Sequence, residues 1–205
     1  MPMHHIGEKE FYEDAKATTD SFLKKNYMVF FEAVRRNGIT DSIQKDTIYR
    51  KVRKITGVDF YTILSNGGYL DTTTNTIMGL KLRYISKHKL VNQSKQLLSS
   101  FDSSHVKNID ADILELMNAT EKKFGKIILE PYDLKTPFRE KYKHKKNKKI
   151  SDFFVSEYRN NLLTDSILKS PYDKIMIVYG AKHFDGILEN LKLVDKNYKE
   201  VGKLD

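Results

Sequence analysis

The chain of 205 residues contains no cysteine. Disulfide bonds, thiolate metal centres and cysteine nucleophiles are therefore excluded, although this absence does not fix the compartment. No stretch approaches the ~20 consecutive apolar residues that a transmembrane helix needs. The first residues lack the basic start and the apolar run of a secretory signal peptide. As printed, the sequence predicts a cytoplasmic protein without a transmembrane segment.

The composition is that of an ordinary globular protein, with 40% hydrophobic and 31% charged residues. The length suits one domain over residues 1–205, with room for an insertion. The formal net charge is +9, and residues 139–149 alone hold seven Lys or Arg and one Glu, a net +6. Such a block can contact phosphates or anionic lipid, although it is more often a solvated loop. Because no DNA- or RNA-binding signature accompanies it, the sequence predicts no specific nucleic-acid partner.

Apolar spacing predicts the regular elements. Helices are expected over 8–25, 40–56, 150–169 and 184–191, and strands over 27–31 and 173–179. Two prolines predict a loop over 127–138, and the last residues predict a hairpin around 195–197. Since the strands lie near the two ends of the chain, the middle, roughly 84–170, is interpreted as a helical insertion that contains the basic loop 139–149. The predicted fold class is α/β, a central mixed β-sheet flanked by helices.

Chemistry-bearing side chains follow several of these elements. His183 comes after the second strand through a Gly180-Ala181-Lys182 turn, and Glu32 ends the first strand. His5 lies near the N-terminus, and Arg159 lies on the helix before the last strand. Two imidazoles and a carboxylate are ligands that suit a divalent metal with open coordination positions, and an arginine can stabilise a developing oxyanion.

Each of these residues also has a structural interpretation. A lone histidine after a strand is more often hydrogen-bonded within the core, and Glu32 could pair with Arg35 or Arg36. Arg159 on a charged helix would ordinarily be a surface residue. The three proposed ligands are too far apart in sequence to form a local metal motif, so only their convergence in space could join them.

The segments that carry these residues resemble TraB/GumN-like proteins of the TraB–Tiki superfamily. Met3-His4-His5-Ile6-Gly7-Glu8 is similar to the opening of that family, and Tyr179-Gly180-Ala181-Lys182-His183 is similar to its second Gly-x-x-His motif. Weaker similarity covers Phe30-Phe31-Glu32, Leu90-Val91-Asn92-Gln93, residues 108–113 and Glu157-Tyr158-Arg159-Asn160. In the first motif, Pro2 stands where the family has glycine if His5 is the motif histidine. His4 is the alternative.

The resemblance implies a metal-dependent hydrolase that acts on amide bonds of a peptide or protein. It implies His5, Glu32 and His183 as ligands of Mn, Co or Zn, with Glu32 and Arg159 as catalytic residues. Gln93, Asp112 and Gly180 would line the substrate pocket. The family also has a full strand before its first motif, so an upstream strand, signal or lipid anchor is an open expectation.

Two other functions fit the same residues. The first is a non-catalytic ligand- or haem-binding protein of the same superfold, in which a histidine with Tyr12 or Tyr179 would ligate the haem iron. The second is a nucleic-acid or anionic-surface binder that works through residues 139–149. Glu32 distinguishes the hydrolase, because a haem pocket needs no carboxylate there.

Overall fold

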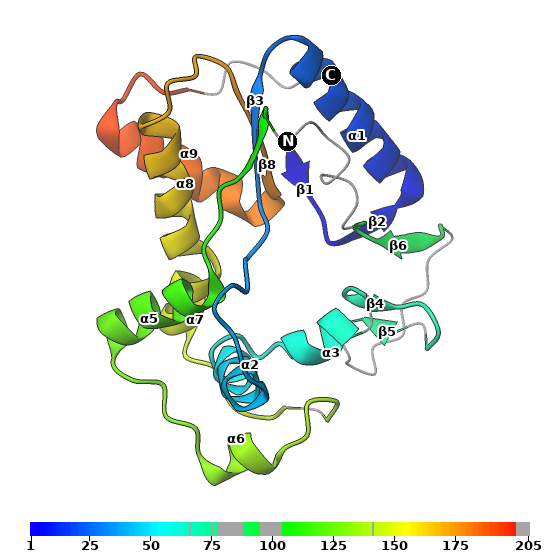
Figure 1. Ribbon diagram of the computed structural model, residues 1–205, viewed down its shortest axis with the longest axis vertical. Helices are drawn as coiled ribbons and strands as arrows, with labels where there is room; N and C mark the ends of the chain where they lie inside the picture. The colour runs from blue at the N-terminus through cyan, green and yellow to red at the C-terminus, as the bar shows by residue number, and fades with distance from the viewer. Residues whose placement is uncertain (66, 75, 78–87, 95–103, 141, 200–205) are drawn as a thin grey trace.

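The fold is built on one parallel sheet. A computed structural model describes residues 1–65, 67–74, 76–77, 88–94, 104–140 and 142–199 (Figure 1). In spatial order the strands are β1 (Pro2–Met3), β8 (Ile175–Gly180), β3 (Met28–Phe31) and β7 (Val106–Asn108). Every pairing between them is parallel. The predicted α/β class is therefore confirmed, and the carboxyl ends of all four strands meet at one edge.

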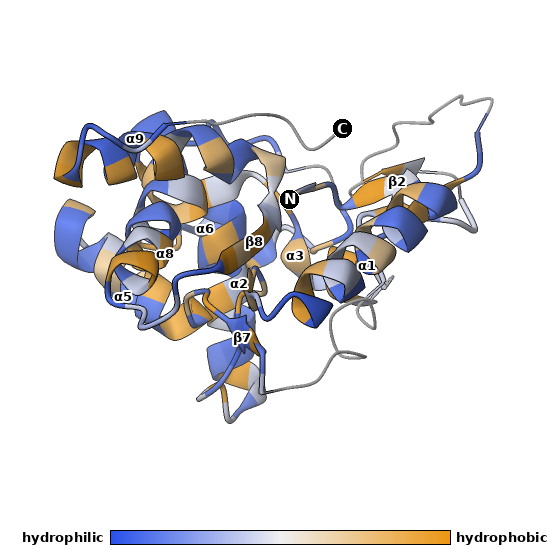
Figure 2. Cartoon of the chain, turned by 90° about the horizontal axis from the view of Figure 1, so that it is seen from above, coloured by the Kyte–Doolittle hydropathy of each residue, from blue (hydrophilic) through white to orange (hydrophobic). Residues whose placement is uncertain are grey.

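Both faces of the sheet are covered by helices, which explains why β3 and β8 are apolar runs rather than alternating ones. Val29 and Val178 face α1 (Lys9–Lys24), while Phe30 and Tyr179 face α8 (Tyr158–Leu168) and α9 (Phe184–Val194). Figure 2 shows β8 between α1 on one side and α8 on the other. This alternation fixes the face on which each residue after a strand emerges.

A second layer of helices packs beyond the carboxyl edge of the sheet. Buried side chains of α2 (Ser42–Thr56) and α5 (Ile113–Phe124) form its core. The remaining elements are short: α3 (Phe60–Ser65), α6 (Pro131–Lys135), α7 (Lys148–Asp152), the π-turn η1 (Phe153–Glu157) and the 3₁₀ turn η2 (Ala181–His183). Two antiparallel pairs lie outside the main sheet, β2 (Ile6–Glu8) with β6 (Leu90–Asn92) and β4 (Leu70–Asp71) with β5 (Thr76–Ile77).

The local signals predicted most helices correctly. The helix predicted over 40–56 begins after Asp41, whose side chain accepts a hydrogen bond from the Gln44 amide. It ends at Gly57, which has the left-handed conformation (φ 75°) that terminates many helices. The helices predicted over 8–25, 150–169 and 184–191 and both predicted strands are also present.

Three predictions about the rest of the chain were wrong. The region 84–170 is not a purely helical insertion, since β7 within it pairs with β3 in the main sheet. The segment 127–138 contains the helix α6, because Pro131 occupies its first turn, where no amide hydrogen is needed. Residues 195–197 form a turn after α9, and no strand follows among residues 195–199. Residues 84–87, 95–103 and 141 of the predicted insertion lie outside the described residues.

Across the described ranges, no helix combines the length and apolar character required to cross a lipid bilayer. The two residues of β1 pair with β8 at the edge of the sheet.

Candidate functional site

The candidate site lies at the carboxyl ends of the four parallel strands. Glu32 follows β3, Gly180 ends β8 and leads through η2 to His183, and His5 follows β1. Asp110 follows β7 and was not predicted as a site residue. Residues 28, 30 and 32 alternate onto the face that α8 covers, so the Glu32 side chain points toward Arg159 on that helix.

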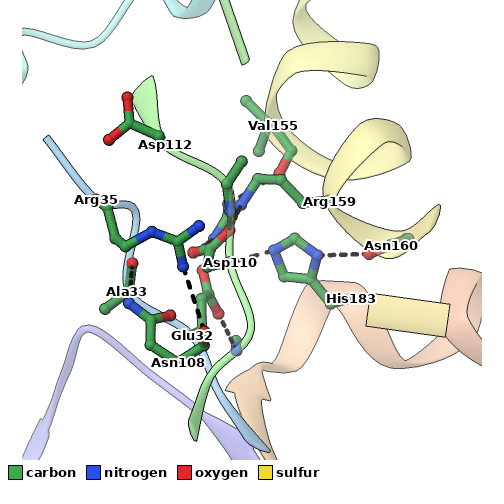
Figure 3. Close-up of polar contacts among 12 residues, drawn as sticks. Glu32, Ala33, Arg35, Asn108, Asp110, Asp112, Val155, Arg159, Asn160 and His183 are labelled. Atoms are coloured by element: carbon green, nitrogen blue, oxygen red, sulfur yellow. Dashed lines mark hydrogen bonds and ion pairs between the residues drawn. The ribbon is translucent and has the colours of Figure 1, made fainter. Parts of the chain in front are cut away.

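Arg159 joins the two carboxylates in a buried network (Figure 3). Its Nη2 donates to Glu32 Oε1 at 2.5 Å and to Asp110 Oδ2 at 2.8 Å, and its Nε donates to Asp110 Oδ1 at 2.8 Å. The side chains of Asp110, Arg159 and Glu32 are 0%, 8% and 14% exposed. The Nη1 of Arg159 donates to the Val155 carbonyl in the π-turn η1. With one guanidinium and two carboxylates, this triad carries a formal net charge of −1 and is almost completely buried.

Gly180 holds the other oxygen of Glu32. The Gly180 amide donates to Glu32 Oε2 at 2.5 Å, and a Cβ at position 180 would lie 3.0 Å from that oxygen. Glycine therefore favours the close approach of the carboxylate, and its backbone conformation is not an unusual one. Burial alone would raise the pKa of Glu32, but the charge of Arg159 and the Gly180 hydrogen bond outweigh it and lower the pKa. Glu32 is an ionised acceptor.

His183 is buried and held in one tautomer. Its Nδ1 lies 2.6 Å from Asn160 Oδ1, which can only accept, so Nδ1 carries the proton and Nε2 keeps a lone pair. Burial lowers the pKa of His183, which favours this neutral form. Asn160 reaches the ring because residue 186 is glycine, since a Cβ there would lie 2.3 Å from Asn160 Nδ2. His183 Nε2 faces Glu32 Oε1 at 3.6 Å.

His5 is exposed at the border of the site and is held from the side of the β2–β6 pair. The Gln93 amide donates to the His5 carbonyl at 2.9 Å, and the Gln93 side chain also hydrogen-bonds the imidazole. The ring stacks on Tyr69, with centroids 4.4 Å apart. Asn92 positions that tyrosine, because its side chain accepts from the Leu70 amide at 2.8 Å and donates to the Leu70 carbonyl at 2.7 Å. Partial burial lowers the pKa of His5.

Tyr179 lies beneath this network. The residue is fully buried, its ring meets that of His183 edge to face at 5.5 Å, and its hydroxyl has no hydrogen-bond partner within the described part of the chain. Burial, then the charge of Asp110, raises the pKa of Tyr179, so the hydroxyl keeps its proton. Tyr12, the other tyrosine considered as a haem ligand, donates its hydroxyl to the His4 carbonyl.

The structure can be compared with the predicted metal centre. The donor types suit a divalent ion, because both imidazoles have lowered pKa values and Glu32 is ionised. The 3.6 Å between His183 Nε2 and Glu32 Oε1 is close to the roughly 3.3 Å that separates two ligands of a tetrahedral zinc. A third ligand is not assembled with them, since no group of three His, Cys, Asp or Glu side chains among the described residues could hold an ion. The complete His5–Glu32–His183 set therefore does not fit a metal centre as arranged here.

Most residues selected from the sequence come together in space. Glu32, Arg159, His183 and Gly180 are in direct contact, and His5 and Gln93 border them. Asp112 is not part of the group: it caps α5, accepting from the Leu114 and Asn37 amides, and Figure 3 shows its carboxylate directed away from Arg159.

Sequence reasoning missed Asp110, Asn160 and Tyr69. The motif Asn108-Ile109-Asp110-Ala111-Asp112 offered two aspartates, and its spacing after a strand could have favoured the one nearer the strand end. Asn160 follows Arg159 directly and lies within the segment Glu157-Tyr158-Arg159-Asn160. No local pattern marks Tyr69 as a site residue, because its contact with His5 depends on the hydrogen bonds between the Asn92 side chain and the backbone of Leu70.

Comparison with protein-family models, with curated proteins and with solved structures found no match for this chain.

Proposed function

We propose that this protein is a hydrolase that cleaves amide bonds of a peptide or protein substrate at the Glu32–His183 pair. One observation carries the proposal. An ionised carboxylate oxygen and an imidazole lone pair face each other at 3.6 Å, and each of them is an acceptor. These two acceptors lie beside the Asp110–Arg159–Glu32 triad, whose formal net charge is −1, and this favours a donor or a cation between them. A water molecule that donates to both is the simplest such group.

That arrangement suits general-base catalysis of hydrolysis. His183 Nε2 would accept a proton from the water while the water oxygen bonds to the carbonyl carbon of the substrate. The C–N bond then breaks, and the leaving nitrogen takes the proton back from Nε2. Asn160 keeps the imidazole in the required tautomer, and Arg159 with the Gly180 amide keeps Glu32 ionised and in position.

Arg159 has a different role here from the one expected of a free arginine. Its Nε, Nη1 and Nη2 all donate to protein acceptors, so it positions Glu32 rather than contacting substrate. Arg35 is the cation available for substrate charge. Its Nη1 donates to the Asn108 carbonyl at 3.3 Å at the same edge of the sheet (Figure 3).

Metal dependence on Mn, Co or Zn is the alternative form of the proposal. In that form Glu32 and His183 would hold the ion, so Nε2 would be a ligand and not the base, and the exposed His5 ring would have to move from its stacked position to complete the set. A bound ion would supply Lewis acidity and a more acidic water. The resemblance to TraB/GumN-like proteins supports this proposal and is itself still a prediction.

The proposal is tested with His183→Gln and Glu32→Gln on a mixture of fluorogenic peptides, with and without added Mn, Co or Zn. We expect each variant to lose at least about a hundredfold in kcat/KM while the far-UV circular dichroism is unchanged. The matched control is His144→Gln, which removes an imidazole from the basic loop and should leave the activity intact. Activity that survives in either site variant would contradict the assignment. Elemental analysis of the wild type and of His183→Gln tests metal binding independently of turnover.

A further inference from the structure

The helix α6 lies at one end of the molecule (Figure 1), and the chain exposes apolar side chains on and just before it. Ile128, Leu134 and Tyr132 are 66%, 53% and 40% exposed. The helix explains the arrangement. Asp133 is buried against α2, where it pairs with Lys54 at 2.7 Å, so the residues on either side of it turn outward. The exposure of Tyr132 and Leu134 is therefore imposed by the helix, and Ile128 lies exposed in the segment before it.

A dense group of cations lies beside these residues. The lysines between residues 142 and 149 are exposed, and none of them forms an ion pair with another residue in the described ranges. They are Lys143, Lys145, Lys146, Lys148 and Lys149. Two exposed acids, Glu130 and Glu140, lie on the same stretch and offset part of this charge.

The start of this basic segment is fixed to the body of the protein. The Tyr142 hydroxyl hydrogen-bonds the Asp133 carboxylate, and the guanidinium of the buried Arg53 lies 4.7 Å from the centroid of the Tyr142 ring. The Lys143 amide donates to the Tyr132 hydroxyl at 2.8 Å. The first lysine is therefore held next to an exposed aromatic ring, so the apolar and cationic groups are presented together.

We propose that this basic–apolar surface, formed by Ile128, Tyr132, Leu134 and the lysines of residues 143–149, binds peripherally to an anionic lipid bilayer. Each lysine near an anionic bilayer strengthens binding by about fivefold. Tyrosine favours the level of the lipid headgroups, and exposed aliphatic side chains gain by entering the acyl boundary. A nucleic acid would also attract the lysines, but its phosphates offer nothing to Ile128 and Leu134. The combination therefore favours lipid, and it does not depend on the proposed hydrolase activity.

The test is co-sedimentation of the full chain with vesicles of phosphatidylcholine containing about 30% phosphatidylserine, against phosphatidylcholine alone. Replacing Lys143, Lys145 and Lys146 together by Gln should weaken binding to the anionic vesicles by about a hundredfold. The matched control replaces Lys24, Lys192 and Lys196 by Gln, which changes the net charge equally. These three are exposed on or beside α1 and α9, at the opposite end of the molecule in Figure 1. The control should bind like the wild type, with binding that falls as salt is raised.

A second pair of measurements separates lipid from other polyanions. Ile128→Ser with Leu134→Ser should weaken vesicle binding by about tenfold, whereas any salt-sensitive binding to duplex DNA should be the same as in the wild type. Three outcomes would overturn the proposal: equal binding to neutral and anionic vesicles, equal losses in the lysine variant and its control, or duplex DNA bound more tightly than anionic vesicles.

Discussion

The buried triad Asp110–Arg159–Glu32 makes a sharp prediction for Arg159→Met. Methionine fills much of the same space but leaves two ionised carboxylates, 0% and 14% exposed, with no cation between them. Removing one partner of a buried ion pair costs about 3–5 kcal/mol of unfolding free energy. Because two anions lose their common partner here, we expect the upper end of that range near neutral pH. In a chain of this length this corresponds to a fall in Tm of about 10–20 °C.

In Arg159→Met, the pH dependence of the unfolding free energy should also be the reverse of that in the wild type. In the wild type the pKa of Glu32 is lowered on folding, so its contribution to stability is present above the unfolded pKa and is lost as pH falls through the folded pKa. Without Arg159, the cation that lowers the pKa of Glu32 is gone, and burial raises that pKa. A carboxyl whose folded pKa is raised contributes stability at low pH that is lost as pH rises through the folded pKa. Arg159→Met should therefore be less deficient near pH 4 than near pH 7.

Urea unfolding followed by circular dichroism measures both effects across this pH range. The control is Lys169→Met at the C-cap of the same helix, which removes an exposed lysine paired with Asp165 at 3.2 Å. Its unfolding free energy should change by no more than about 0.5 kcal/mol. A loss below about 1 kcal/mol in Arg159→Met, or a large loss that does not vary with pH, would refute the reasoning that two ionised acids share one buried cation.

Three further predictions concern the residues around this triad. Gly186→Ala places a methyl group 2.3 Å from Asn160 Nδ2, so the hydrogen bond between Asn160 and His183 should break. The imidazole NMR signals of His183 should then show a change of tautomer, and unchanged signals would argue against the close fit of Gly186 to Asn160. Asn92→Ala removes both hydrogen bonds to residue 70 and should lower the unfolding free energy measured in urea by about 1–3 kcal/mol. Tyr69 should also be iodinated faster, and an unaltered iodination rate would contradict the role of Asn92 in positioning Tyr69. Because burial lowers the pKa of His183, hydrolysis should stay near its maximum as pH falls through 6.5 and decline only in more acidic buffer; a midpoint above 6.5 in the pH–rate profile would count against a buried neutral base.

The local elements of this fold could be predicted because they depend on neighbouring residues. The cap at Asp41, the stop at Gly57 and the apolar runs of β3 and β8 are each encoded within a few positions. The short strands could not be predicted in the same way. β7 has three residues, and only its pairing with β3 makes it part of the sheet, so the span around it read as a helical insertion.

The residues of the candidate site were likewise only partly predictable from local sequence. The sequence by itself determined which groups follow the strand ends, because a parallel α/β sheet places Glu32 and His183 at one edge. Tertiary structure alone decided how they are held. Asp110 rather than Asp112 holds Arg159, and Asn160 sets the tautomer of His183. These choices depend on contacts between segments many residues apart, which no local pattern records.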